Sequence, residues 1–555
     1  MKYLFAITFL VLIVLSGGIY LSFPDVRSDL PVIYWVTDNN PARREQVARF
    51  HRWLIARGEG ERVRIETMAQ LTAYRARHYT SSIRAAIKQA NADGPAAYDP
   101  ATDEADLPLE LTVPRCELRL DTANRDPSKQ IIQGVSGVTG DVMDIGPGQL
   151  RYFVATGMLT DLTEAAQELG FSPRATFPAI EPGITVDGRQ YTFPCNVAVR
   201  LLWVNEATFA KYGMDPPPKR WTLEQFESIG KAFVERANAG KSRREVFFAN
   251  RLDLQIMHRS LGLSAFNETL TRCTLGDERF VRCLELLHKW THEDHLLPSA
   301  AEEASFDTQS GYGGAALQLF NSGNYAMFDM GRYALIRLRD FGQLELSAVE
   351  PPHGGFPNTL ITTRSAAVYA ASPNRAHALR FLQYLADEAY NTQIVRDADA
   401  LPPNPKFTET ELFKRPPDHP HEHGVHEAFA EAAHSLAAGE ASSPFVLDSS
   451  VKRLIKEATD KVMAGRLDPE AAAVQCAERI NARIRRTTDE VPRLAREHKR
   501  LVKLQTRIDA RRAAGEPVPL DWIRNPFYQH YYQHKGWAEP TESAATDSVG
   551  TKEAH

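Results

Sequence analysis

The stretch VIYWVTDNNP, residues 32–41, predicts a short strand that runs directly into a loop and a helix. Its first five residues are β-branched or aromatic and favour a strand, whereas the polar run that follows favours a turn. The helix after it ends at Gly58. Its apolar residues follow helical spacing: Val47, Phe50, Trp53 and Leu54. A strand-to-helix junction is therefore expected at residues 38–41.

The same order of strand and helix occurs twice more in the first third of the chain. Residues 117–120, ELRL, predict a second strand and residues 141–145, DVMDI, a third, each leading into a helix. Such alternation requires parallel strands joined by right-handed crossovers, which defines an α/β fold. Ligands of such sheets bind beyond the carboxyl ends of the strands. The loops expected at that edge are residues 38–41, 121–126 and 146–149.

A second unit is expected after residue 194. Residues 201–204, LLWV, predict its first strand, and residues 222–238 predict a helix with Thr222 as its cap. Residues 59–113 lack clear periodicity, and the Pro-, Gly- and Asp-rich run at 91–108 predicts an exposed inserted loop.

Two amphipathic helices follow near the end of the chain, at residues 451–465 and 468–486, with Gly465 between them. We expect this pair to cover a sheet.

The N-terminus carries no charged residue from Tyr3 to Pro24. About 20 such residues, at ~1.5 Å each, would span a hydrocarbon layer of ~30 Å. Lys2 precedes the run and places the rest of the chain outside the cytoplasm. Small residues at 16–18 keep a cleaved signal peptide open as an alternative to the retained anchor that we favour.

Composition excludes several classes of protein. The chain of 555 residues is 43% hydrophobic and 24% charged, which is typical of globular proteins with more than one domain. Its 65 Lys and Arg against 70 Asp and Glu provide no general cationic field, so no nucleic-acid partner is expected. Of the five cysteines, Cys273 and Cys283 are either a disulfide or, as we expect, two buried thiols.

Four motifs, in the right order, resemble the family 1 extracellular solute-binding proteins of ABC importers, the group that contains maltose-binding proteins. The most specific is FNSGNYAMFDMGRYAL at 320–335, which fits the pattern F-x-x-G-x-x-A-M-x-x-x-G-x-[WY]. The other three are GRQYTFPCNVAVRLLWVNEATFAKYGMDPPPKRWTLEQF at 188–226, DVMDIGPGQLRYFVATGMLTDLT at 141–163 and AASPNRAHALRFLQYL at 370–385. The resemblance covers most of residues 31–487, without about 59–113.

The resemblance implies a two-lobed periplasmic-binding-protein fold of type II, an α/β fold in which each lobe has a mainly parallel sheet. Ligand would be enclosed between the lobes as they close about their hinge. The expected hinge crossings lie at residues 193–198, 348–352 and 401–405. The expected divisions are 1–24 signal peptide or anchor; 31–195 with 350–400 lobe 1; 196–349 with 401–487 lobe 2; 488–537 helical and aromatic extension; and 538–555 disordered tail.

Sugar binding requires aromatic rings that stack on CH faces and planar polar side chains that bind hydroxyls. Tyr333 matches the stacking aromatic of the family, although a core tyrosine is the alternative. The adjacent Arg332 would bind hydroxyls or pair with an acid at the rim. The other expected ligand-binding residues are Asp38, Asn39, Asn40, Gly148, Gln149 and Asn196. As an alternative to ligand binding, one residue of 38–40 would cap the helix that follows, and turn formation would account for Gly148.

The chain departs from the family pattern at Ala198, where an acid is common, so the sugar specificity of known members does not transfer. Histidines at 288, 292 and 295, and in HPHEHGVH at 419–426, match no zinc motif and favour a solvated loop or helix face, so no metal or cofactor is expected. Asp141 and Asp144 do not define a catalytic pair. A Walker A loop is also missing from the sequence, so the ATPase would be another chain.

These observations predict an extracytoplasmic, non-enzymatic component of an ABC importer, anchored or secreted, that delivers a carbohydrate-like ligand to a permease. Two alternatives remain: a polysaccharide-acting hydrolase, and a tethered sensor or scaffold with a degenerate cleft. In the extension, apolar residues from Val491 to Ile508 recur at threes, fours and sevens within a basic stretch, and 522–537 is rich in aromatics. We expect both segments to pack on the body of the protein.

Overall fold

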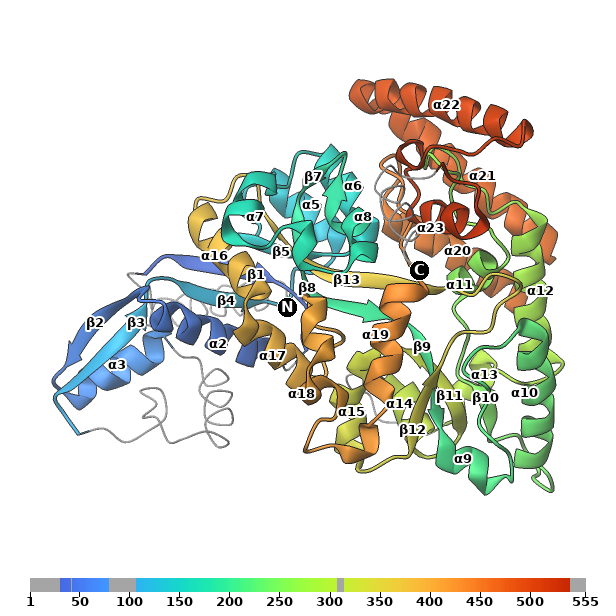
Figure 1. Ribbon diagram of the computed structural model, residues 1–555, viewed down its shortest axis with the longest axis horizontal. Coiled ribbons are helices and arrows are strands. Elements are labelled where there is room, and N and C mark those ends of the chain that lie inside the picture. Colours follow the sequence, from blue (N-terminus) through green and yellow to red (C-terminus); the bar gives the residue numbers. More distant parts are fainter. Residues whose placement is uncertain (1–29, 41, 79–105, 307–313, 540–555) are drawn as a thin grey trace, which may run out of the picture.

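The computed structural model describes residues 30–40, 42–78, 106–306 and 314–539. Within them the chain forms two lobes, each built on a sheet flanked by helices, with the C-terminal helices stacked at one end (Figure 1). The alternation of strand and helix read from the sequence is present in both lobes.

The first sheet has the order β14-β13-β5-β1-β4, and β8 also pairs with β13. Its strands are β1 (Val32–Val36), β4 (Glu117–Asp121), β5 (Val142–Ile145), β8 (Thr192–Val199), β13 (Thr359–Val368) and β14 (Ala437–Gly439). β1 is parallel to β4 and β5, as predicted, but β13 is antiparallel to β5 and β8. The carboxyl end of β5 therefore meets the middle of β13, where Ser365 pairs with Ile145.

The second sheet has the order β10-β11-β9-β12. Its strands are β9 (Leu201–Asn205), β10 (Phe247–Ala249), β11 (Tyr325–Met330) and β12 (Leu346–Val349). β10 and β11 are parallel, whereas β9 is antiparallel to both of its neighbours. The expectation of a mainly parallel sheet in each lobe is wrong here, because β9 is a central strand of this sheet and runs antiparallel to both β11 and β12.

Helices cover both faces of the first sheet, because alternate residues of β1 point to opposite sides. Ile33 and Trp35 pack in one cluster with Phe50 of α2, whereas Val36 packs in another with Phe153 of α6. The helices of this lobe are α2 (Ala42–Ala56), α5 (Pro127–Val135), α6 (Pro147–Ala155), α7 (Thr163–Leu169), α8 (Glu181–Ile184), α16 (Arg375–Ala386) and α17 (Glu388–Asp397). A short hairpin follows α8, and its strands, β6 (Thr185–Val186) and β7 (Arg189–Gln190), have two residues each.

The second sheet is sandwiched in the same way. Leu202 and Val204 of β9 face α10 and α12, whereas Leu201 and Trp203 face α14, α15 and α19. The helices around it are α9 (Glu206–Lys211), α10 (Leu223–Ala237), α11 (Leu254–Ser260), α12 (Glu278–His292), α13 (Ala300–Ala304), α14 (Gly314–Asn321), α15 (Leu335–Leu338), α18 (Glu411–Lys414) and α19 (Val425–Ser435). Thr222 caps α10 as predicted, since its hydroxyl accepts from the Gln225 N–H and the Gln225 side chain accepts from the Thr222 N–H.

The chain leaves the first sheet at Arg200, the single residue between β8 and β9. It returns through residues 350–358, between β12 and β13. One hydrophobic cluster continues beneath this junction, because Val199 of β8, Trp203 of β9 and Ile361 of β13 all belong to it. The two sheets are therefore joined by packed side chains as well as by the chain itself.

The segment after Gly58 is more ordered than its sequence suggested. β2 (Gly60–Ile65) and β3 (Leu109–Pro114) form an antiparallel hairpin, and α3 (Met68–His78) follows β2. Figure 1 shows this unit projecting from one end of the molecule. The local sequence shows no periodicity for residues 60–78 and 109–113, because the pairing of the two strands supplies a register that no short stretch reveals. Of the loop predicted at 91–108, residues 91–105 lie outside the described residues.

The C-terminal helices pack on the second lobe. α20 (Asp448–Met463) and α21 (Pro469–Glu490) share a hydrophobic cluster with Phe280 and Leu284 of α12 and with the loop at 263–275. They therefore cover a helix and a loop and not, as predicted, a sheet. α22 (Pro492–Ala513) adds Leu501 to this cluster.

The aromatic segment at 522–537 packs on residues 350–358, through which the chain returns to the first sheet. Phe356 contacts four rings of α23 (Pro526–Lys535), at centroid distances from 4.9 Å to 5.9 Å: Phe527, His530, Tyr531 and His534. Arg259 of α11 is buried beside them, where it donates to the Ala438 and Gly439 carbonyls of β14 and lies over the Phe527 ring. The extension thus packs on the body of the protein, as expected.

All five cysteines are buried free thiols, so Cys273 and Cys283 do not form a disulfide. Among the described residues, no helix is long and apolar enough to cross a membrane. The predicted anchor or signal peptide, residues 1–24, lies outside those residues, as do residues 540–555 of the predicted tail.

Candidate functional site

A buried cluster of ionic side chains lies at the carboxyl ends of β1 and β5. The Arg43 guanidinium contacts the Asp38 carboxylate at 2.7 Å and the Asp399 carboxylate at 2.5 Å. Arg364, which comes from the middle of β13, contacts Asp144 of β5 at 2.5 Å. These residues meet because the parallel strands end at one edge and β13 returns antiparallel across it.

Charge pairing dominates the titration of this cluster. Burial alone would raise the pKa of Asp38, but Arg364 and Arg43 hold it at about 2. Burial would likewise lower the pKa of Arg364, yet Asp144 raises it well above its usual value. Asp38 therefore stays ionised at neutral pH and provides no general acid. The cluster is suited to binding by charge and hydrogen bonds.

Arg364 retains unused hydrogen-bonding capacity. Its Nε and Nη2 are buried without a hydrogen-bond partner among the described residues, and the nearest carboxylates, of Asp38 and Asp399, lie 3.9 Å away. Buried donors of this kind are rare in native structures. They are suited to a ligand oxygen.

The predicted residues at the end of β1 separate into different roles. Asp38 joins the ionic cluster, and Asn196 reaches it by donating from Nδ2 to Asp399, 3.1 Å away. Asn39 is exposed. Asn40 is buried, and its Oδ1 accepts from the Ala42 N–H at the start of α2, so it is the expected capping residue.

The N-terminus of α6 faces the N-terminus of α20. A Cβ on Gly148 would lie 2.8 Å from the Asp448 carboxyl carbon, so only glycine permits this approach. The Gln149 side chain turns back and accepts from the Gly146 N–H at 3.2 Å. Lys452 bridges Asp448, at 2.9 Å, and Glu440, at 2.6 Å. Burial and Glu440 together raise the pKa of Asp448 to about 6.

Arg332 and Tyr333, adjacent after β11, differ in environment. Arg332 is 1% exposed and donates to His426 Nδ1 and to the carbonyls of Ala400 and Val395. We therefore remove Arg332 from the ligand-binding residues, because its donors hold the protein itself. Tyr333 is half-buried, and its ring covers Gly331, where a Cβ would lie 2.6 Å from it.

The second lobe contributes a charged edge that the sequence analysis missed. Arg200, between β8 and β9, binds Asp329 of β11 with two hydrogen bonds of 2.9 Å, and Asp253 lies 3.8 Å from it. Arg251 lies 3.6 Å from the same Asp329 carboxylate. The available signal was a single acid within the apolar strand AMFDM, since a buried acid requires a partner.

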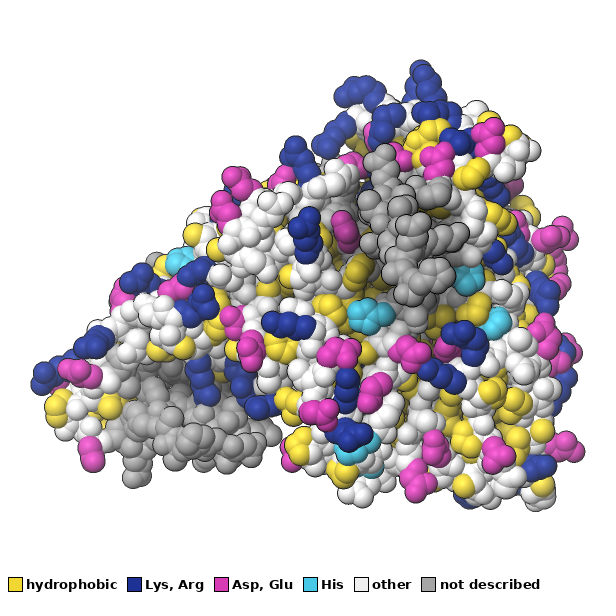
Figure 2. Space-filling model, viewed as in Figure 1, with side chains coloured by type: hydrophobic (Ala, Val, Ile, Leu, Met, Phe, Trp, Pro, Cys, Tyr) yellow, Lys and Arg dark blue, Asp and Glu magenta, His cyan; other side chains and the backbone are white. Residues whose placement is uncertain are grey.

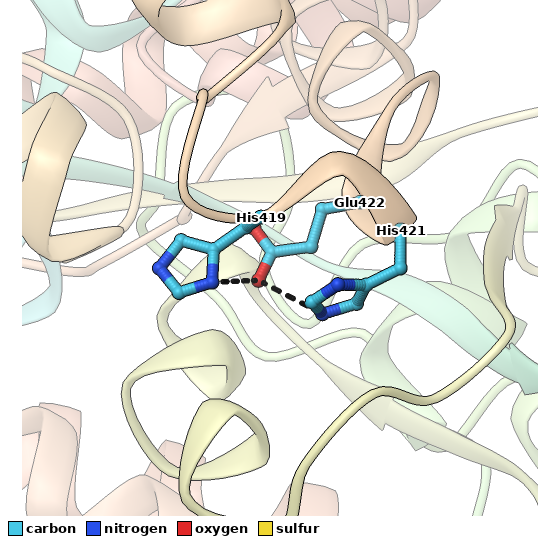
Figure 3. A group of neighbouring side chains, drawn as sticks. All are labelled: His419, His421 and Glu422. Carbon is cyan, nitrogen blue, oxygen red and sulfur yellow. Dashed lines mark ion pairs between the residues drawn. The ribbon is translucent and has the colours of Figure 1, made fainter.

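The histidine-rich stretch is held by an ion pair. Glu422 is fully buried and receives two hydrogen bonds from Arg339, at 2.8 Å and 2.9 Å. Figure 3 shows its carboxylate between His419 and His421, which lie 4.0 Å and 3.9 Å away. A metal ion would have to compete with the Arg339 guanidinium for both oxygens. The expectation of a solvated loop is nevertheless wrong at Glu422 and His426, which are buried.

Comparisons with known proteins agree with this architecture. A family model described as "Bacterial extracellular solute-binding protein" matches residues 125–421, more than half of the chain. An ABC substrate-binding protein of Listeria monocytogenes, solved with cycloalternan, has a TM-score of 0.60 at 18% identity, covering 82% of this chain and 99% of its own.

Two further solved structures have the same fold. The maltose/maltodextrin-binding domain of Bdellovibrio bacteriovorus, bound to maltotriose, has a TM-score of 0.56 at 16% identity, over 82% of this chain and all of that chain. UgpB of Mycobacterium tuberculosis, in complex with glycerophosphocholine, has a TM-score of 0.55 at 14% identity, over 67% of this chain and 91% of that chain. At such identities the likeness concerns the fold.

Proposed function

Since this chain belongs to the bacterial extracellular solute-binding proteins, we propose that it captures a carbohydrate-like solute between its two lobes and delivers it to the permease of an ABC importer. The family places its work outside the cytoplasm. The fold leaves the ligand class open, because similar structures hold an oligosaccharide in one case and glycerophosphocholine in another.

The observation that carries the proposal is the pair of unpartnered Arg364 donors at the edge of the first sheet. The Asp38 carboxylate, about a fifth exposed, lies beside them as an acceptor. A sugar hydroxyl both donates and accepts, so donors and an acceptor fixed side by side match its chemistry. Tyr333 supplies an aromatic face from the other sheet for the apolar side of a sugar ring.

We take the lobes as residues 31–195 with 350–400, and 196–349 with 401–487. Arg200 then lies at the hinge, and the contact of Gly148 with Asp448 joins one lobe to the other. Closing and opening would make and break this contact as ligand enters and leaves.

A binding role requires no chemistry on the ligand. Asp38 and Asp399 each pair with Arg43, which lowers the pKa of both carboxyl groups and keeps them from acting as general acids. Asp448 and Glu440 lie close together, but both pair with Lys452. Retaining and inverting hydrolases require one protonated and one free carboxyl group, about 5 to 10 Å apart. We therefore propose that the chain is not an enzyme.

A sensor or scaffold with a degenerate cleft is the second candidate. It is favoured by the number of expected ligand-binding side chains that bind the protein itself: Asn40, Gln149, Asn196 and Arg332. Such a protein would bind no free solute.

For attachment to the membrane we propose the N-terminal segment, residues 1–24, as a retained anchor. Mass spectrometry of the mature N-terminus in membrane and soluble fractions decides between an anchor and a cleaved signal peptide. An intact Met1 in the membrane fraction is the expected result.

Calorimetric titration and thermal-shift screening of the full chain against a saccharide panel test the main proposal. A binder gives a saturable rise in melting temperature that grows as RT ln(1 + [L]/Kd), with no product formed. Released product would favour a hydrolase. No response to any saccharide, with the chain still retained by its permease, would favour the sensor or scaffold.

A further inference from the structure

A cavity of about 380 Å³ lies beside the C-terminal half of α6. One wall is formed by α6 and the β6–β7 turn, and the other by α22 and the loops at 269–270, 444 and 524. Small-molecule sites in proteins typically have volumes of about 300 to 1,000 Å³. The cavity is therefore large enough for a sugar ring.

Positive charge dominates the lining of this cavity. It contains two carboxylates, Asp187 and Glu497, against five arginines, which are Arg151, Arg493, Arg496, Arg500 and Arg524. The protein as a whole carries a formal charge of −5, so the excess is local. Figure 2 shows Lys and Arg side chains gathered over α22 at one tip of the molecule.

The arginines are largely unpaired. Four of the five, all except Arg500, form no ion pair or side-chain hydrogen bond with any residue that the structure describes. Arg500 binds Glu497 at 2.9 Å and 2.5 Å and so uses one of the two acids. The Nε of Arg524 is buried without a partner among the described residues.

Two of these guanidinium groups, those of Arg151 and Arg524, belong to opposite walls of the cavity. Burial lowers the pKa of Arg151, and the positive charge of Arg524 lowers it further, while Asp187 and Glu497 oppose the shift. Two like charges held in a partly buried cavity are unfavourable unless an anion lies between them. A guanidinium presents a planar fork of donors that fits the oxygens of a carboxylate, sulfate or phosphate.

One residue of the cavity lining is close in sequence to the expected ligand-binding residues. Arg151 follows Gln149 by two positions on α6. The other four arginines lie outside residues 125–421, the part matched by the family model. The apolar part of the lining could receive the uncharged body of a ligand: Val154, Ala155, Val186, Leu270, Pro444, Leu494 and Leu501.

We propose that this cavity binds the anionic group of an acidic saccharide, with Arg151 and Arg524 as its principal ligands. The inference rests on the function proposed above and names its class of solute. The C-terminal extension then completes the binding site, since the anion is held between α6 of the first lobe and the region around α22.

The test is calorimetric titration of the full chain with disaccharides supplied in neutral form and with one uronate carboxylate. Sulfate and phosphate monoesters of the same sugars, and the inorganic anions alone, are further arms. We expect the acidic form to bind at least about tenfold more tightly than the neutral form. Raising the salt concentration should reduce this advantage.

Substitutions in the cavity lining then identify the residues that cause the preference for the acidic saccharide. Arg151→Gln and Arg524→Gln should each remove most of the advantage of the acidic form, and the double variant should bind both forms alike. Arg466→Gln is the matched control, because Arg466 is exposed between α20 and α21 and does not line the cavity. Arg151→Lys and Arg524→Lys should restore part of the preference, and circular dichroism checks that each variant is folded.

Two results would overturn the inference. Equal affinity for neutral and acidic saccharides would do so and would leave the proposed function intact. An acidic preference that survives the double variant would place the anion elsewhere. If inorganic phosphate or sulfate bound in an Arg524-dependent way while no saccharide bound, the anion site would stand and the proposed capture of carbohydrate would be wrong.

Discussion

The Nε of Arg332 donates a hydrogen bond to Nδ1 of His426, 3.0 Å away, in the interior of the second lobe. The rest of the guanidinium binds the Val395 carbonyl of α17 and the Ala400 carbonyl, and lies over the Phe413 ring. Burial and Arg339 lower the pKa of Arg332 to about 9. A buried cation without a bonded carboxylate thus fixes the segment next to Tyr333.

Replacing Arg332 should therefore affect stability. In Arg332→Met three hydrogen bonds are lost and two buried carbonyls lose a donor, so we expect the free energy of unfolding to fall by about 3 kcal/mol. Urea denaturation measures the change. Arg337→Met, at a more exposed site on α15, is the control and should cost less than about 0.5 kcal/mol. Equal effects of the two substitutions would contradict the role described for Arg332.

Replacing Tyr333 should affect ligand binding more than it affects stability. Tyr333→Ala removes the aromatic face, so we expect saccharide binding to weaken at least about tenfold, with a smaller loss of stability than Arg332→Met. Tyr333→Phe keeps the ring and should bind within about threefold of the natural chain. Titration calorimetry distinguishes these outcomes. An unchanged affinity in Tyr333→Ala would remove this residue from the site.

Gly148→Ala tests the contact between α6 and α20. Alanine in a helix is usually more stable than glycine by about 1 kcal/mol, but here its Cβ would lie 2.8 Å from the Asp448 carboxyl group. We expect the two helix ends to separate, with a larger radius of gyration by small-angle X-ray scattering. Gly146→Ala is the control, because nothing lies within 4 Å of its Cβ. A more stable Gly148→Ala variant of unchanged dimensions would show that this contact does not set the lobe spacing.

Because of Glu422, the free energy of unfolding should depend on pH in the acidic range. Burial would raise its pKa, but hydrogen bonds from Arg339, with the His426 ring 3.2 Å away, hold it at about 2, below the ordinary 4.5. As the pH falls, the unfolded chain therefore takes up the proton on Glu422 before the folded chain does. The ionised Glu422 thus stabilises the fold by about 3 kcal/mol above about pH 5, and this stabilisation is lost as the pH falls toward 2. Unfolding free energies measured from pH 6 to pH 2 should show a flatter curve for Glu422→Gln.

Glu409→Gln is the control for this experiment, since Glu409 is exposed and pairs with Lys414 at the surface. It should leave most of the slope in place. The same slope in Glu422→Gln as in the natural chain would assign the acid sensitivity to other carboxyl groups.

The sequence predicted the elements and their order well, because periodicity and capping act locally. The strand at 32–36, the helix that follows it and the Thr222 cap all form as expected. The antiparallel pairing of β9 was missed because strand direction depends on how the chain crosses between lobes. The β2–β3 hairpin was missed because its partners are separated by more than 40 residues.

Site residues were harder to predict than elements. Motif matching located both Arg332 and Tyr333, but the motif could not show that only Arg332 points into the core. The ionic pairs of Arg364 and Arg200 join residues far apart in sequence. Their geometry depends on the fold, and a buried acid such as Asp329 was the only local sign.

The packing of Phe356 against α23 has a consequence for biogenesis. The ring contacts of Phe356 join the segment between the lobes to residues 527–534, which follow both lobes in the sequence. A polypeptide that crosses a membrane from its N-terminus delivers α23 after both lobes. The connection between the lobes therefore matures only once α23 has been translocated, and until then the exported part holds an apolar segment around Phe356 that must be shielded from aggregation.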